Sequence, residues 1–217
     1  MKEKVGAVFS VAKENPPIAG CTVSKKIHGS NNPIIVFSLA RDTDISAEIY
    51  PYHKLLLMAD GSMEVYHADG SCKTLHAGEA LLTETDIPVG MRTQDSAVYT
   101  EIEIRRNDTM NSAIKAGEVF RLGNLVPYQE GKIVNMDVVH NDKMKFVVMA
   151  FDAGTGLSEH AAPGEALVFA LDGEGIIGYE GQMHPIKAGE CFHFAKGGLH
   201  SVKAEQQFKM ALLLTLE

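Results

Sequence analysis

Residues 154–173 read GTGLSEHAAPGEALVFALDG, and residues 188–201 read AGECFHFAKGGLHS. Each stretch holds a run of strand-forming residues between glycine-containing turns, with His160 at the head of the first run and His200 just past the second. Short apolar runs separated by such turns are typical of β-hairpins. We therefore expect a small barrel of short strands, with the two histidines meeting at its mouth.

The rest of the chain contains a second copy of this pattern. Residues 43–51 (TDISAEIYP) align with residues 155–163 (TGLSEHAAP) at an offset of 112 residues, and Val8-Phe9 align with Val119-Phe120 at an offset of 111. The aligned positions stay in order and include turn residues as well as apolar ones. Self-similarity at a fixed offset indicates two copies of one structural unit.

Short strands dominate both predicted units. Asp-Gly and Ala-Gly pairs between the runs, such as Asp60-Gly61 and Asp172-Gly173, are predicted as turns between separate strands. A short helix is expected at residues 107–118, between a first domain at residues 1–107 and a second at 118–217. Regular spacing of short strands predicts an all-β sandwich or barrel. The expected strands cover residues 34–39, 54–58, 62–67, 80–82, 97–104, 132–139, 145–151, 166–171, 176–179, 191–194 and 209–216.

Composition narrows the class of protein. The 217 residues carry a formal net charge of -8, which argues against a nucleic-acid-binding surface. The apolar runs are too short to span a bilayer, and the N-terminal residues lack the apolar core of a signal peptide. The three cysteines Cys21, Cys72 and Cys191 form no CxxC pair, which fits a reducing compartment. We expect a cytoplasmic protein with neither nucleic-acid nor membrane partners.

The second half resembles a cupin domain. Cupins carry a first motif, G-x5-H-x-H-x3-4-E-x6-G, and a second motif, G-x5-P-x-G-x2-H. The first half follows the same outline without the motifs, so the whole chain is similar to a bicupin. This resemblance implies an all-β fold of two tandem cupin-like double-stranded β-helix (jelly-roll) barrels. The residues that carry it are Gly154, His160 and Gly173 for the first motif, and Gly189, Gly197 and His200 for the second, with Ala195 in the place of the proline.

The resemblance also implies a metal site of three histidines and one carboxylate. His160 and His200 stand at two of these positions, whereas Ala162 and Ala166 stand at the second histidine and the glutamate. Imidazole and carboxylate ligands suit Zn, Ni, Mn or Fe. One divalent transition metal and no cofactor at all are both consistent with this half-vacated set.

Glu165, His193 or water are the candidates to complete a metal shell with His160 and His200. Glu165 is one residue away from the expected position, which on a strand points a side chain to the other face unless the preceding turn re-aims it. His193 alternates with two phenylalanines and faces outward if they fill the barrel. The alternative is a metal-free pair, either hydrogen-bonded at the barrel mouth or left over from a lost site.

Without a metal, the two histidines suit an anionic or hydroxylated small molecule, or acid–base chemistry near neutral pH. Ala162 and Ala166 would leave a roomy, mostly apolar pocket with few polar anchors. The first hypothesis is a small-molecule-binding bicupin with its pocket around His160 and His200. The alternative is a metal-dependent cupin enzyme such as a dioxygenase, a decarboxylase or an isomerase.

The first unit offers no metal shell. Its positions matching His160, Ala162, Ala166 and His200 are Glu48, Tyr50, Lys54 and Val89, and we interpret this unit as degenerate and structural. A homodimer is expected from the resemblance, because cupin sheets often pack through apolar faces. The leucines at residues 55–57 would form such a patch if they were exposed.

Overall fold

The computed structural model describes residues 3–28 and 32–216, which form two compact units. The first unit contains Val11–Asp108 and Ser112–Arg121, and the second contains Glu3–Ser10, Thr109–Asn111 and Leu122–Glu217. The described residues include only a one-turn helix α1 (Val11–Glu14) and a 3-10 turn η1 (Leu122–Asn124), so the all-β prediction is confirmed. No helix in these ranges is long and apolar enough to cross a membrane.

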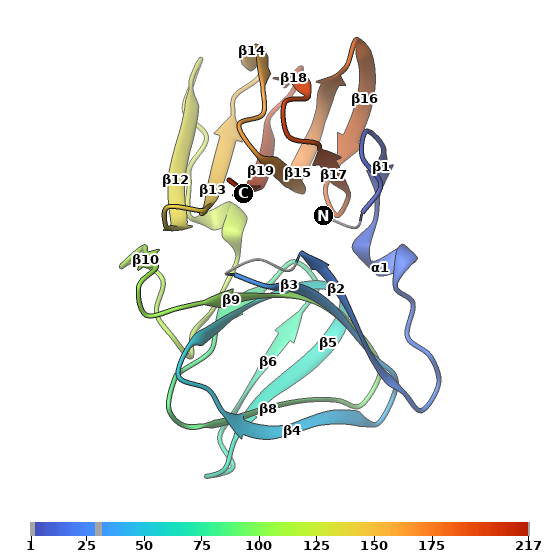
Figure 1. Ribbon diagram of the computed structural model, residues 1–217, viewed down its shortest axis with the longest axis vertical. Helices are drawn as coiled ribbons and strands as arrows, with labels where there is room; N and C mark the ends of the chain where they lie inside the picture. The colour runs from blue at the N-terminus through green and yellow to red at the C-terminus, as the bar shows by residue number, and fades with distance from the viewer. Residues whose placement is uncertain (1–2, 29–31, 217) are drawn as a thin grey trace. The chain divides into compact units, whose positions relative to one another are not determined.

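The first unit is built from two sets of paired strands. One sheet has the order β11-β7-β5-β9-β3-β2, and β5 also pairs with β6 and with β8, which pairs with β4. Within this unit Figure 1 shows β2, β3 and β9 as one layer and β4 with β8 as another. The strands are β2 (Thr22–His28), β3 (Ile34–Leu39), β4 (Thr43–Ile49), β5 (His53–His67), β6 (Cys72–His76), β7 (Ala80–Leu82), β8 (Pro88–Thr93), β9 (Ala97–Ile104) and β11 (Val119–Phe120).

The second unit repeats this topology. Its main sheet has the order β1-β17-β15-β19-β13-β12-β10, while β15 also pairs with β16 and with β18, which pairs with β14. The strands are β1 (Val8–Phe9), β10 (Thr109–Met110), β12 (Ile133–His140), β13 (Met144–Phe151), β14 (Gly156–Ala161), β15 (Glu165–Tyr179), β16 (Gln182–Lys187), β17 (Cys191–Phe194), β18 (Leu199–Lys203) and β19 (Phe208–Thr215).

Asp60-Gly61 and Asp172-Gly173 lie inside long strands and do not end them, so their prediction as turns was wrong, whereas Asp69-Gly70 forms the predicted turn between β5 and β6. β5 and β15 run through Asp60-Gly61 and Asp172-Gly173, where the pairing with β9 and β19 shifts register. Gly61 has a φ of 75° and Gly173 a φ of 70°, which side chains other than glycine rarely adopt. These bulges bend each long strand, so that one strand pairs in both sheets.

The helix predicted at residues 107–118 is absent; the short strand β10 lies in this range, and β11 follows directly after it. Thr109–Met110 pair with β12 of the second unit, whereas Val119–Phe120 pair with β7 of the first. Pairing with an exposed sheet edge satisfies backbone groups that an isolated short helix would stabilise poorly. The β11 strand therefore belongs to the unit that precedes it in the chain.

The N-terminal strand is exchanged in the same way. Val8 and Phe9 pair with Phe192 and Cys191 of β17, so Glu3–Ser10 belong to the second unit. β1 and β11 occupy matching positions in the sequence repeat. β1 precedes the first unit in the chain but completes the second, and β11 precedes most of the second unit but completes the first. The compact units therefore depart from the predicted division at residues 1–107 and 118–217.

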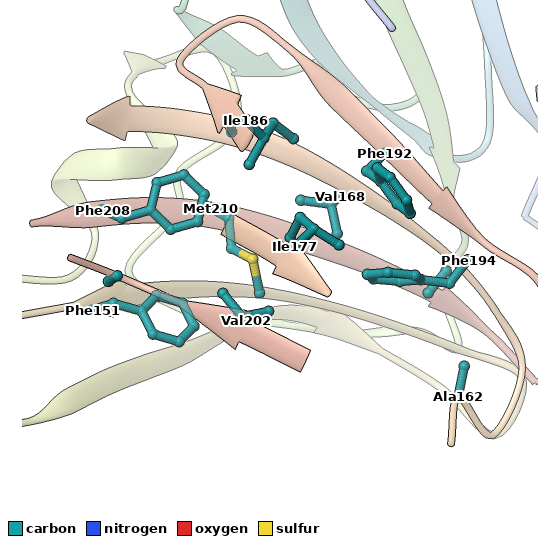
Figure 2. Close-up of a cluster of buried hydrophobic side chains, with 13 residues drawn as sticks. Phe151, Ala162, Val168, Ile177, Ile186, Phe192, Phe194, Val202, Phe208 and Met210 are labelled. Carbon is teal, nitrogen blue, oxygen red and sulfur yellow. The ribbon is translucent and has the colours of Figure 1, made fainter. Parts of the chain in front are cut away.

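Each unit has its own apolar core between its sheets. In the second unit the core includes Phe151, Val168, Ile177 and Phe192, which point toward one another in Figure 2. The first unit has a core that includes Leu56, Met58, Val65 and Tyr99.

The leucines at residues 55–57 do not form an exposed patch. All three are buried, because β5 is an inner strand between β7 and β9. The prediction of a dimer surface at this place was wrong, and the homodimer itself stays a prediction.

Candidate functional site

The structure brings His160 and His200 together, as the sequence predicted. They are directly opposite each other in the pairing of β14 with β18, and their ring centroids are 4.2 Å apart. His160 is exposed, whereas His200 is only 6% exposed. One ring of the pair therefore faces solvent, and the other lies in the interior of the second unit.

Backbone carbonyls fix the orientation of both rings. His160 Nδ1 lies 2.8 Å from the carbonyl oxygen of Ser158, and His200 Nδ1 lies 3.2 Å from that of Gly198. A carbonyl oxygen only accepts hydrogen bonds, so in the neutral rings each Nδ1 carries the proton and each Nε2 keeps its lone pair. No hydrogen bond to either Nε2 comes from residues 3–28 or 32–216, which leaves both nitrogens available to a ligand.

Burial keeps His200 neutral at pH 7. Desolvation lowers the pKa of His200, and the neighbouring His160 lowers it further, while the hydrogen bond to Gly198 acts in the opposite direction. The imidazolium form is disfavoured because little water reaches the ring. His200 therefore presents an acceptor at neutral pH.

An aromatic wall flanks His200 on its inner side. The Phe194 ring lies 4.2 Å from the His200 ring at an interplanar angle of 29°, and Tyr179 is opposite His200 on β15. Ala162 and Ala166 are 3% and 2% exposed and belong to the same buried core as Phe194. Ala162 lies at the margin of that core in Figure 2, and both alanines pack in it, so the inner flank of the pair is apolar.

Glu165 and His193 lie together, apart from the histidine pair. His193 Nε2 is 3.8 Å from Glu165 Oε1, and His193 Nδ1 is 2.8 Å from the carbonyl oxygen of Glu3. Phe192 and Phe194 fill the core, so His193 faces the other side of β17, as the alternation predicted. It is nevertheless fully buried, and desolvation lowers its pKa.

The residues of the pair do not fit a metal ion. Glu165 lies in β15 opposite Thr215, and its Oε1 is 3.8 Å from His193 Nε2. Among residues 3–28 and 32–216, no group of three or more histidine, cysteine or acidic side chains is placed to bind a metal. Two imidazoles beside buried alanines and a phenylalanine provide fewer ligands than zinc sites normally use.

Two grooves lie away from His160 and His200, one in each unit. One is lined by residues including Glu174, Lys187 and Glu205, and the other by residues including Ser62 and Asp95. Glu174 and Ser62 hold matching places in the sequence repeat, so each unit has a groove at the same place in its strands. Ile176, in the first groove, pairs with Lys203, at the end of β18 away from His200.

The first unit holds a polar cluster that the sequence only partly indicated. Lys54 Nζ lies 3.4 Å from Glu101 Oε1 and 3.8 Å from the centre of the Tyr50 ring, and the Tyr50 hydroxyl donates a hydrogen bond to Glu48. Glu48, Tyr50 and Lys54 are the residues that match the metal positions of the second unit. Glu101 and Tyr99 were not predicted from the sequence, and nearly every residue of β9 is buried, so no alternation of exposure marks them.

Comparisons with known proteins agree with this architecture. Residues 147–216 match the family model of the cupin domain. A Cupin 2 conserved barrel domain protein from Leptotrichia buccalis is 30% identical, with a TM-score of 0.85 over 99% of this chain and 98% of that one. The chain belongs to the cupin family. Its all-β fold is accordingly the jelly roll of that family.

Two solved structures of much lower identity share the fold alone. Salicylate 1,2-dioxygenase from Pseudoaminobacter salicylatoxidans, solved as adducts with gentisate, is 12% identical and has a TM-score of 0.64 over 99% of this chain and 83% of that one. Oxalate decarboxylase from Lactobacillus farciminis, solved as a formate complex, is 10% identical and has a TM-score of 0.54 over 98% of this chain and 87% of that one. A search of curated proteins finds no match.

Proposed function

We propose that this cupin is a bicupin that binds a small, weakly acidic molecule at His160 and His200 without a metal. The ligand carries a carboxylic acid, an enol or a phenol. The observation that carries the proposal is the pair of Nε2 atoms, on one exposed and one buried histidine, whose Nδ1 nitrogens both lie against backbone carbonyls. An acidic O–H would donate to one Nε2, or transfer its proton and be held by the resulting imidazolium.

The register of the strands supports a barrel in each unit. Glu48 is opposite Val89 in the first unit as His160 is opposite His200 in the second, and both pairs follow a bulge. Lys54 is opposite Glu103 as Ala166 is opposite Leu214. The same pairing in both halves is what two tandem cupin barrels would produce.

The structure favours binding over metal-dependent catalysis. A cupin dioxygenase, decarboxylase or isomerase would need further ligands beside the pair, and the alanines at those positions provide none. Apolar walls with a few polar anchors are the usual lining of a small-molecule site. Phe194 and Tyr179 supply such walls for a ligand held by the two imidazoles.

Calorimetric titration of EDTA-treated protein tests this proposal. Benzoate, pyruvate and acetate serve as probes, and at least one is expected to bind the wild-type protein with proton uptake near pH 7. Binding should weaken by about tenfold or more in His160→Ala and in His200→Ala, since each removes a hydrogen bond to a charged group. The control is His76→Ala, which alters an exposed histidine of the first unit. The proposal would be refuted if none of the three probes bound the wild-type protein. It would also be refuted if the wild type and all three variants bound them equally well.

A further inference from the structure

The polar cluster of the first unit contains buried groups that the protein itself does not satisfy. The Tyr99 hydroxyl and Glu101 Oε2 are buried and have no hydrogen-bond partner among residues 3–28 and 32–216. Tyr99 is 0% exposed and Glu101 is 7% exposed. Leaving a buried polar group without a partner is costly, so each such group in a native protein needs an explanation.

These groups share the inner face of the first unit. Glu101 is opposite Leu56 on β5, and Tyr99 is opposite Met58, and both of these β5 residues belong to the apolar core. Tyr99 and Glu101 are two residues apart on β9, which places both side chains on one face. Glu103 continues the same face toward the end of β9 and lies opposite Lys54.

The second unit shows that the fold does not require this polarity. The positions that match Tyr99, Glu101 and Glu103 in register are Met210, Leu212 and Leu214 on β19. Those three side chains pack against the apolar core of their unit. The polar face of β9 is therefore a property of the first unit alone.

Two tyrosine rings lie beside the Lys54–Glu101 ion pair. Tyr50 and Tyr52 are half-buried with ring centroids 5.3 Å apart, and Tyr50 lies against the ammonium of Lys54. The Lys54–Glu101 distance of 3.4 Å is longer than a charge-assisted hydrogen bond of about 2.8 Å. The ion pair thus keeps hydrogen-bonding capacity on both partners.

We propose that the inner face of the first unit, around Lys54, Tyr99 and Glu101, binds a small neutral polyhydroxylated molecule such as a monosaccharide or a polyol. A ligand hydroxyl would donate to Glu101 Oε2 and accept from Lys54 or from Tyr99. The tyrosine rings supply apolar faces for the C–H side of such a ligand.

Charge selects against the other ligand classes. The carboxylates of Glu48, Glu101 and Glu103 would repel an anion, whereas the ammonium of Lys54, 3.4 Å from Glu101, would repel a cation at the same place. Burial raises the pKa of Tyr99 well above its usual range, so its hydroxyl stays protonated and able to donate. Burial also raises the pKa of Glu101, while Lys54 opposes that shift. Matched donors and acceptors remain, which suits a neutral ligand.

Thermal unfolding with D-glucose, D-mannose, D-fructose, myo-inositol and ribitol tests this site. At least one compound is expected to raise the Tm of the wild-type protein by about 2 °C or more at saturating concentration. Tyr99→Phe should lower the affinity for that ligand by about tenfold, because the substitution removes one hydrogen bond to it. Without ligand, the same variant should keep or raise the Tm, because the lost hydroxyl has no protein partner.

Two further variants separate this site from the histidine pair. Glu101→Gln should abolish the polyol response and leave the benzoate, pyruvate or acetate response unchanged. His160→Ala should do the reverse, so each proposal can fail without the other. If no polyol raises the Tm, or if the rise survives both Tyr99→Phe and Glu101→Gln, the proposal is overturned and water is the partner of these groups.

Discussion

At the residue scale, the burial of His200 makes stability depend on pH. Its pKa lies below the ordinary value of 6.5, so the unfolded chain takes up a proton at a higher pH than the folded protein does. The free energy of unfolding is therefore expected to fall as the pH drops below about 6.5. His193 has a lowered pKa for the same main reason and adds to this loss.

Replacing His200 should remove part of that loss. His200→Gln is expected to flatten the decline of Tm between about pH 6.5 and pH 5, because the unfolded chain then gains one proton fewer in this window. His76→Gln, at an exposed position, serves as the control and should leave the slope unchanged. An equal decline in His200→Gln and wild type would contradict the account of this residue.

At the element scale, the bulges in β5 and β15 decide how one strand serves two sheets. A Cβ atom on Gly173 would lie 2.1 Å from the carbonyl oxygen of Gln207, and one on Gly61 would lie 2.0 Å from that of Ser96. Neither carbonyl can move without breaking the adjoining strand. These two glycines are therefore required by close backbone approach as well as by their φ angles.

Gly173→Ala should destabilise the protein far more than Gly181→Ala. Gly181 has a similar φ of 76°, but a Cβ atom there would meet nothing within 4 Å. We expect a cost of about 1 kcal/mol for Gly181→Ala and about 3 kcal/mol or more for Gly173→Ala. Chemical denaturation of both variants gives the comparison. Costs that agree within experimental error would show that the bulge does not constrain the fold.

Sequence patterns could predict most strands, but not the bulges in β5 and β15 or the short strands β1 and β11. The alternation around Phe192 and Phe194 gave both the core and the outward direction of His193. An Asp-Gly pair favours a turn and a bulge alike, so its position between two apolar runs could not show that β15 continues. The strands β1 and β11 span two residues each, which is too short for any periodic signal.

At the scale of the whole molecule, the exchange of β1 and β11 sets which residues form a complete unit. A fragment of residues 1–107 lacks β11 and carries a strand that belongs to the other unit. A fragment of residues 11–121 holds every described strand of the first unit. Each unit thus depends on a segment that a division at residue 107 removes.

The fragment of residues 11–121 should accordingly be more stable than the fragment of residues 1–107. Losing β11 exposes the edge of β7 and leaves its backbone groups without partners. We expect a Tm at least several degrees higher for residues 11–121, and less aggregation. A fragment of residues 1–107 that matches or exceeds it in Tm would contradict the strand assignment.

The candidate sites were predictable to different degrees. The two strand runs, each with a histidine at one end, and the cupin motifs were enough to predict that His160 and His200 meet. Glu101 could not be placed in the same way, because a charged residue in an alternating strand is normally assigned to the solvent face. Its inward direction follows from the register with Leu56 and from the compensating charge of Lys54.

The central claim is that His160 and His200 offer two unprotonated Nε2 atoms to an acidic ligand without a metal. The most direct measurement is the NMR of the histidine side-chain nitrogens in untagged protein at pH 7, with and without benzoate, pyruvate or acetate. We predict the Nδ1–H tautomer for both rings, and shifts of both Nε2 resonances when one of these ligands is added. An Nε2–H tautomer on either ring, or Nε2 resonances that respond to none of the ligands, would contradict the account.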